Sequence, residues 1–312
     1  CPRVTIPDAG PVRGTAQGEL VAHQTDPMGR RDVLALGGAA LAGLVASQAV
    51  AAGPATVKFA LTPVFLTSDL DLLDKLKSYL QQATGRPVQL VTRRTYQEIT
   101  AMILAGQVDA AWVCGFPYVA NKTQMQLVAV PVWHSRPVYQ SYLISDAART
   151  ATDLEHLKGD IHAFSDPDSN SGYLVTAAEL ASKAISPEAF FSQTFYTYGH
   201  RNVVRAVGSG LAQSGSVDGY VYEVLRTMEP DLVAATRVVR ASAWYGFPPV
   251  ACLAATANSE NTRLLTKALL GMQADPTGRE VLAMLELDSF SAEPPSLFDT
   301  IGANMELVRK RA

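Results

Sequence analysis

The turn at residues 164–173 holds the side chains best suited to ligand chemistry, because it reads Phe-Ser-Asp-Pro-Asp-Ser-Asn-Ser-Gly-Tyr between an expected strand and an expected helix. Hydroxyl groups and the unpaired N–H groups of a helix N-terminus satisfy oxygen acceptors, and the helix dipole favours negative charge there. We therefore expect Ser169, Asn170, Ser171 and Gly172 to surround a small oxyanion. An ordinary helix cap, with Ser169 or Asn170 as the capping residue, is the alternative.

Three further segments follow expected strands and bring groups suited to ligand contact. They contribute Cys114, Gly115 and Tyr118 from the first, His200 from the second, and Asp218 and Tyr220 from the third. Ligands of open α/β sheets bind outside the carboxyl ends of the strands, so we expect the four segments to converge on one cleft. The alternatives are a surface His200 that caps the following helix and a solvated turn carboxylate at Asp218.

Asp218 would be an unusual neighbour for an oxyanion. Two negative charges fit together only if the ligand or the carboxyl group keeps a proton, or if the ligand also carries a cationic group. The pattern therefore favours a protonated oxyanion or a ligand with a cation.

Cys114 has three open interpretations. A free cysteine commonly packs as a small buried hydrophobe, but a thiolate also binds soft elements. A disulfide with Cys252 is the third, if the two strands lie side by side. The five histidines, at positions 23, 134, 156, 162 and 200, show no zinc-ligand spacing, so we expect no metal and no cofactor.

Composition argues against several other function classes. The chain carries 26 basic and 29 acidic residues, scattered along 312 positions, so nucleic acid is not an expected partner. The motifs of serine hydrolases, zinc proteases, P-loop enzymes and CxxC oxidoreductases are missing from the sequence. We therefore expect a protein without catalytic activity. A secreted enzyme that depends on Cys114 is the alternative.

Apolar runs that alternate with amphipathic stretches predict an α/β fold. Strands are expected at 57–61, 88–91, 108–113, 161–164, 195–198 and 217–222, and helices from Ser68 or Asp69 to Gly85 and at 96–104, 173–184, 203–211, 260–272 and 276–287. Extended segments at 127–133, 139–145, 236–241 and 250–254 suit a chain that crosses twice between two lobes. The last two helices would close the sequence and pack on the first lobe.

The N-terminal region predicts export. An adjacent arginine pair at Arg30 and Arg31 precedes an apolar run at 33–45 and an Ala-Val-Ala cleavage pattern at 49–51, which is typical of a twin-arginine signal over residues 28–52. A membrane anchor is the alternative, but the run is short for a span and contains three glycines. We interpret residues 1–27 as upstream sequence or a disordered extension.

The turn at 165–175, the string Asp-Ala-Ala-Trp-Val-Cys-Gly-Phe-Pro-Tyr at 109–118, Gly199-His200 and the stretch 217–221 occur in the order and spacing of one family. In these features the chain resembles the phosphate, phosphite and phosphonate-binding proteins of ABC importers over most of residues 55–300. The resemblance implies a type II-like periplasmic binding protein fold, in which two mixed-sheet lobes joined by two hinge crossings close over the ligand. It also implies that the serine-rich turn holds the phosphorus-bound oxygens and that His200 and Asp218 line the pocket.

With that resemblance, lobe 1 would comprise residues 55–143 and 247–312 and lobe 2 residues 144–246, with hinges near 142–145 and 242–247. We expect a periplasmic monomer that delivers a small oxyanion to an ABC permease. Cys114 departs from the family, many of whose members have glycine there, and is similar to the pocket cysteine of arsenite-binding sensors. The alternative partner is therefore a sensor histidine kinase.

Overall fold

A computed structural model of the protein describes residues 55–62 and 70–311. The predicted export signal and the predicted helix start at Ser68 or Asp69 lie outside these residues. Within the described residues, no helix is both long enough and apolar enough to cross a membrane.

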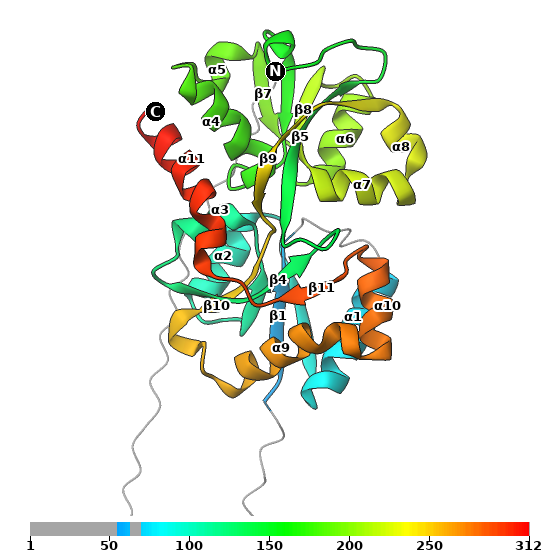
Figure 1. The fold of residues 1–312 in the computed structure, drawn as a ribbon, viewed down its shortest axis with the longest axis vertical. Coiled ribbons are helices and arrows are strands. Elements are labelled where there is room, and N and C mark those ends of the chain that lie inside the picture. The colour runs from blue at the N-terminus through cyan, green and yellow to red at the C-terminus, as the bar shows by residue number, and fades with distance from the viewer. Residues whose placement is uncertain (1–54, 63–69, 312) are drawn as a thin grey trace, which may run out of the picture. The chain divides into compact units, whose positions relative to one another are not determined.

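The first of two mixed sheets has the strand order β11-β4-β10-β3-β1-β2. Its parallel half consists of β1 (Val57–Leu61), β2 (Val88–Thr92) and β3 (Ala110–Trp112). Its antiparallel half consists of β10 (Val250–Leu253), β4 (Met125–Val132) and β11 (Ser289–Ser291). The helices around it are α1 (Leu70–Thr84), α2 (Tyr96–Leu104), α3 (Gly115–Ala120), α9 (Glu260–Gly271) and α10 (Pro276–Met284) (Figure 1).

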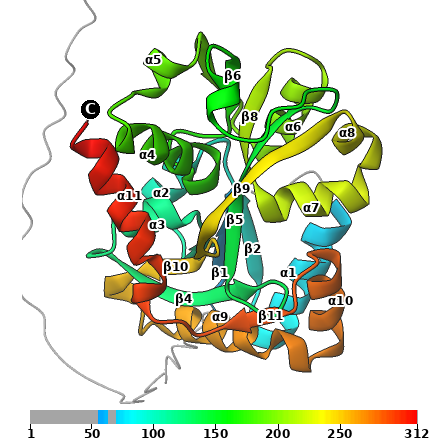
Figure 2. The same cartoon turned by 45° about the horizontal axis from the view of Figure 1, so that its top comes forward.

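The second sheet has the order β7-β6-β8-β5-β9. Its strands are β7 (Gln193–Tyr196), β6 (Ile161–Phe164), β8 (Ser214–Asp218), β5 (Val138–Asp146) and β9 (Thr236–Gly246). Figure 2 shows its helices, which are α4 (Val175–Ser182), α5 (Pro187–Phe190), α6 (His200–Gly208), α7 (Gly219–Met228) and α8 (Pro230–Ala234). Two mixed sheets with helices confirm the predicted two-lobe α/β fold.

Local sequence explains several element boundaries. Thr95 and Glu98 form a capping box that starts α2, since the Thr95 hydroxyl accepts the Glu98 N–H and the Glu98 carboxylate accepts the Thr95 N–H. Gly106, with φ of 64°, follows the end of α2 in the left-handed region that favours glycine. Helix α1 buries one side, made of Leu72, Leu76, Tyr79 and Leu80, as its helical spacing predicts.

Three predicted elements are confirmed residue for residue, namely the strands at 57–61 and 161–164 and the helix at 96–104. The strand predicted at 217–222 is wrong beyond Asp218. There the Asp218 carboxylate accepts the Val221 N–H and caps α7, so that the apolar run after Gly219 is helical.

The prediction that the helix at 276–287 closes the sequence is also wrong. Strand β11, the 3₁₀ turn η5 (Pro295–Phe298) and helix α11 (Asp299–Arg309) follow it. Helix α11 contacts both α3 beside the first sheet and α4 beside the second. The C-terminal helix therefore packs on helices of both lobes and not on the first lobe alone.

The first crossing between the two sheets lies earlier in the chain than the predicted hinge. Strand β5 pairs with β9 from Val138 to Asp146, so it belongs to the second sheet throughout and the predicted hinge at 142–145 lies inside it. The chain passes from the first sheet to the second between Val132 and Val138, and returns between Gly246 and Val250.

Candidate functional site

Buried polar side chains from both sheets meet at the ends of strands β2, β3, β6, β7 and β8 and the start of β5. We call them the polar cluster, and each is at most 2% exposed: Tyr96, Cys114, Tyr139, Asn170, Ser171, His200 and Asp218. Tyr96 and Cys114 follow strands of the first sheet, and the others belong to elements of the second. Strand ends of both sheets therefore lie close together here.

The serine-rich turn winds into a single π-helical turn, η2 (Asn170–Leu174), that leads into α4. The Ser169 hydroxyl accepts the Gly172 N–H at 3.0 Å, so Ser169 is the cap of this turn. A Cβ at Gly172 would lie 1.8 Å from the Ser165 Oγ, so only glycine lets the turn approach β6 this closely. Capping thus occupies Ser169 and leaves Asn170 and Ser171 to face the other lobe and β8.

Asn170 connects the two lobes. Its backbone N–H donates to the Cys114 Sγ at 3.2 Å, and its side-chain amide donates to the Tyr139 hydroxyl at 3.0 Å. Its Oδ1 is buried and has no hydrogen-bond partner among the described residues. Such an oxygen is costly to bury and marks a position where a polar partner is expected.

Ser171 and Asp218 form the second half of the site. The Ser171 hydroxyl donates to the Asp218 Oδ2 at 3.4 Å, and the Ser171 carbonyl accepts the Ser141 hydroxyl at 2.6 Å. Burial raises the pKa of the Asp218 carboxyl to about 7, against hydrogen bonds from Val221, Tyr220 and Ser171 that lower it. This carboxyl group therefore holds its proton far more readily than an exposed aspartate does.

His200 is a buried first residue of α6 and not a surface cap. Its Nδ1 accepts the Asp218 N–H at 3.1 Å, and burial lowers its pKa to about 3, so the ring is neutral. A neutral ring that accepts at Nδ1 carries its hydrogen on Nε2, which lies 3.2 Å from the Tyr96 hydroxyl and donates to it. The Tyr96 O–H proton is consequently directed toward another acceptor.

Cys114 is a protonated thiol in this environment, because burial raises its pKa to about 12. Both Cys114 and Cys252 are free and buried, so the disulfide interpretation is wrong. A neutral thiol that accepts the backbone N–H groups of Asn170 and Phe116 fits the packing interpretation better than thiolate ligation. No group of residues within 55–62 and 70–311 is arranged to hold a metal ion.

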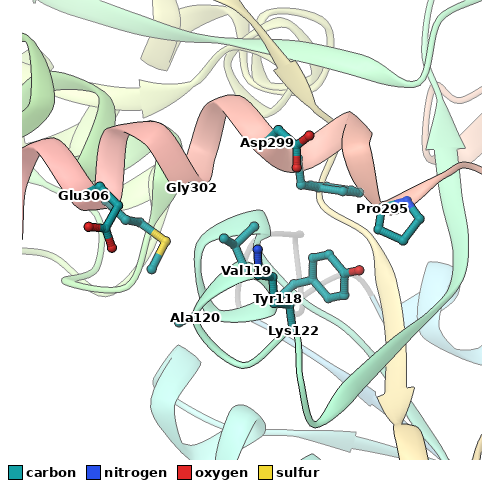
Figure 3. A pocket seen from close by; sticks show the side chains of 10 residues that line it. Tyr118, Val119, Ala120, Lys122, Pro295, Asp299, Gly302 and Glu306 are labelled. Atoms are coloured by element: carbon teal, nitrogen blue, oxygen red, sulfur yellow. The ribbon is translucent and has the colours of Figure 1, made fainter.

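Two of the predicted ligand contacts, Gly115 and Tyr118, pack against the C-terminal part of the chain. The Tyr118 ring packs edge-on against Phe298 at 5.1 Å and lines a groove of about 480 Å³ between α3 and α11, shown in Figure 3. A Cβ at Gly115 would lie 2.6 Å from the Ile301 Cδ1. Gly115 and Tyr118 thus pack against the C-terminal segment that contains α11, a helix that the sequence did not predict.

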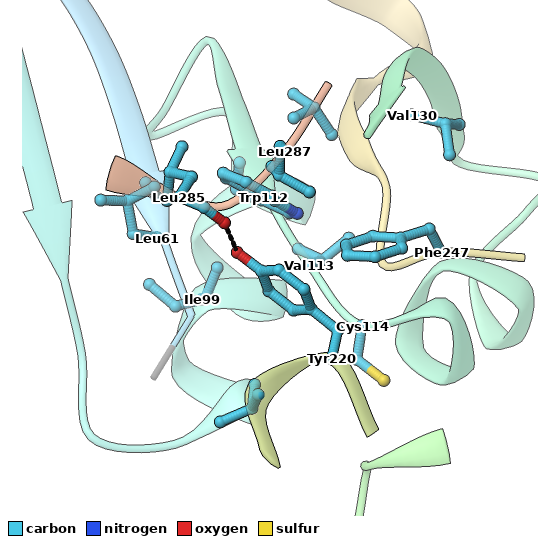
Figure 4. Close-up of a cluster of buried hydrophobic side chains, with 14 of the residues drawn as sticks. Leu61, Ile99, Trp112, Val113, Cys114, Val130, Tyr220, Phe247, Leu285 and Leu287 are labelled. Atoms are coloured by element: carbon cyan, nitrogen blue, oxygen red, sulfur yellow. Dashed lines mark hydrogen bonds between the residues drawn. The ribbon is translucent and has the colours of Figure 1, made fainter. Parts of the chain in front are cut away.

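Tyr220 also points away from the cluster. Its hydroxyl donates to the Leu285 carbonyl at 2.5 Å (Figure 4). Its ring packs between Phe247 and Trp133, with centroid distances of 5.0 and 5.8 Å. Leu285 ends α10 beside the first sheet, whereas Tyr220 belongs to α7 beside the second. The expected ligand contact is instead a contact between the lobes.

Two cluster residues were missing from the prediction. Tyr96 follows the carboxyl end of β2 and starts α2, so the rule applied to the other strand ends would have found it. Tyr139 lies at the start of β5, and its hydroxyl accepts from the side-chain amide of Asn170, 31 residues later in the chain, which no local pattern indicates.

As a whole, the cluster offers hydroxyl, amide and imidazole hydrogen-bonding groups with one carboxyl group and no cationic side chain. Asp166 adds a second carboxyl at its border, accepting the Tyr96 N–H at 3.4 Å, and burial raises its pKa too. An arrangement of this kind is chemically suited to a small polar species of low net charge.

Comparisons with known proteins indicate the family of the chain. Residues 59–296 match a family model described as "ABC transporter, phosphonate, periplasmic substrate-binding protein". The phosphate-import protein PhnD of Mycolicibacterium smegmatis is 29% identical over 175 residues, which cover 52% of this chain and 54% of that relative. The matched region thus spans about half the length of this curated relative.

Two solved structures have the same fold. A binding protein component of an ABC phosphonate transporter from Pseudomonas aeruginosa has a TM-score of 0.75 at 20% identity, covering 82% of this chain and 87% of that one. PhnD1 from Prochlorococcus marinus, in complex with methylphosphonate, has a TM-score of 0.72 at 15% identity, covering 82% and 98%.

Proposed function

Because the chain belongs to the family of periplasmic substrate-binding proteins of phosphonate ABC transporters, we propose that it captures a small phosphorus oxyanion between its lobes. The observation that carries this proposal is the polar cluster, in which buried donors from both lobes surround Asn170 and Ser171 at a helix start. The arsenite-sensor alternative is not favoured, since the family match is to importers and the Cys114 thiol is protonated.

The charge of the cluster favours an oxyanion that retains a proton. Asp218, the carboxyl in the cluster, titrates near neutrality, and the neutral His200 offers no compensating positive charge. A dianion beside an ionised carboxylate would be strongly disfavoured in this buried setting. A singly charged phosphate, phosphite or phosphonate, or a phosphonate with a cationic group, meets the requirement.

The cargo would be released unchanged to an ABC permease. Binding closes the lobes by contacts that exist only when both surround the ligand, and the closed form is what the membrane partner recognises. We infer a monomeric, non-catalytic protein that the twin-arginine signal at residues 28–52 sends to the periplasm.

Calorimetric titration of the full chain tests the proposal. The ligands are phosphate, phosphite, methylphosphonate and 2-aminoethylphosphonate at pH 7, with sulfate, which keeps no proton at this pH, as the matched control. We expect micromolar or tighter binding of at least one phosphorus ligand and none of sulfate. Equal binding of sulfate, or no binding of any phosphorus ligand, would overturn the proposal.

A further inference from the structure

The second sheet contains a line of buried polar side chains that extends away from the polar cluster. Ser214 and Ser216 alternate along β8 with the cluster residue Asp218, and the three so lie on one face of the strand. Each has a polar partner: Ser214 and Ser216 pair with His162 of β6, and Asp218 pairs with Ser171. We call Ser214, Ser216, His162 and their partner Thr176 the polar seam.

His162 is the centre of the seam and is fully buried. Its Nδ1 lies 2.8 Å from the Ser214 hydroxyl and its Nε2 lies 2.9 Å from the Ser216 hydroxyl. Its ring stacks on Phe191 at 4.1 Å, with an interplanar angle of 17°. Burial lowers the pKa of His162 to about 3, so the ring is neutral and joins one donor to one acceptor.

The seam continues into the helix that carries the candidate site. The Ser216 hydroxyl lies 2.7 Å from the Thr176 hydroxyl on α4. Thr176 is two residues after η2, whose Ser171 meets Asp218 on the same strand face as Ser216. The hydrogen bonds of Ser216 and of Asp218 therefore fix α4 and η2 against β8 at two neighbouring points.

Apolar side chains would fill this space without needing partners, and a buried polar network costs stability unless every member is satisfied. Buried polar contacts are best attested where they set the register of packed elements. We propose that His162, acting through Ser216 and Thr176, is a positioning residue that holds Asn170 and Ser171 in register with Asp218. The consequence for ligand affinity rests on the proposed function above.

Thr176 gives the sharpest test, because valine keeps its shape and removes only the hydroxyl. Thr176→Ser keeps the hydroxyl, and Thr236→Val is a matched control. The Thr236 hydroxyl is buried in the same lobe, where it donates to the Val233 carbonyl and contacts the Tyr222 hydroxyl at 3.0 Å. Both valine variants should lower thermal stability to a similar extent.

For methylphosphonate and phosphate, we expect Thr176→Val to raise the Kd about three- to tenfold, whereas Thr176→Ser and Thr236→Val stay near wild type. Ser216→Ala and His162→Phe should act like Thr176→Val if they fold. Equal affinities of Thr176→Val and Thr236→Val would overturn the positioning role.

A second readout needs no ligand and separates this inference from the proposed function. The backbone amide resonances of Asn170 and Ser171 should shift in ligand-free Thr176→Val and not in Thr236→Val. If the wild type binds neither methylphosphonate nor phosphate while these resonances shift, the proposed function fails and the positioning role stands. Unchanged resonances in Thr176→Val would overturn it.

Discussion

The Asp218 N–H donates to the Nδ1 of His200, while the Asp218 Oδ2 accepts the Ser171 hydroxyl, so one residue of β8 orients both the histidine and the serine of the candidate site. His200 in turn donates a hydrogen bond from its Nε2–H to the Tyr96 hydroxyl, which belongs to the other lobe. This order of donors and acceptors explains why the site can remain neutral when buried.

The first prediction concerns the pH dependence of stability. Burial raises the pKa of Asp218 from 3.8 to about 7, so between these values the folded protein binds a proton that the unfolded chain has lost. Stability from this group is full below about pH 4 and is lost as the pH rises through about 7. Asp218→Asn should remove this loss, because asparagine keeps an oxygen for the Val221 N–H.

Thermal unfolding of ligand-free wild type and Asp218→Asn between pH 4 and pH 8 measures the effect. We expect the Tm difference in favour of the variant to grow up to about pH 7 and then level off. A difference that does not change with pH would mean that the carboxyl titrates as an exposed aspartate does.

The second prediction concerns Tyr220 as a contact between the lobes. Tyr220→Phe removes the hydroxyl that donates to the Leu285 carbonyl, and this loss should favour the open form. Phosphonate binding should become about three- to tenfold weaker, although the Tyr220 hydroxyl is not expected to contact the ligand. Tyr222→Phe is the matched control on the same helix, since its hydroxyl bonds to Thr236 within one lobe.

Small-angle scattering of the ligand-free proteins should show a larger radius of gyration for Tyr220→Phe than for Tyr222→Phe. If Tyr220→Phe lowers the Tm but leaves both affinity and scattering unchanged, the Tyr220 contact persists in the open form and has no part in closure.

The third prediction concerns Gly172. An added Cβ would lie 1.8 Å from Oγ and 2.6 Å from Cβ of Ser165, so Gly172→Ala must displace η2 or β6 and should cost several kcal/mol, as overpacked buried sites do. Gly271→Ala is the control, since nothing lies within 4 Å of its added Cβ. Urea unfolding would contradict the account if the two alanine variants were equally stable.

Much of the fold could be predicted from sequence because hydrophobic periodicity and caps are local. The helix at 96–104 has its capping box within three residues, and the strand at 161–164 is bounded by clear polar turns. The end of β8 could not be predicted from apolarity, since the residues after Gly219 are apolar in either structure and only the Asp218 cap decides for helix.

For the site, strand ends identified Asn170, Ser171, His200 and Asp218, which the structure brings together. The direction of these side chains could not be predicted from the sequence. Tyr118 is the fourth residue of α3 and Tyr220 is the second residue of α7, and near a helix start a small rotation decides between ligand and core. Tyr118 packs on Phe298 of the turn η5, just before α11, and Tyr220 reaches the Leu285 carbonyl at the end of α10, so both partners are distant along the chain.

Calorimetric titration of methylphosphonate and phosphate into wild type, Ser171→Ala and Ser182→Ala tests directly whether the ligand binds at the serine-rich turn. Ser171 is buried in the polar cluster, whereas Ser182 is exposed at the end of α4 and donates to the Glu179 carbonyl. We predict a Kd at least about tenfold higher in Ser171→Ala, as expected when a hydrogen bond to a charged ligand is lost, and unchanged in Ser182→Ala. Equal affinity in all three proteins would contradict a binding site at this turn.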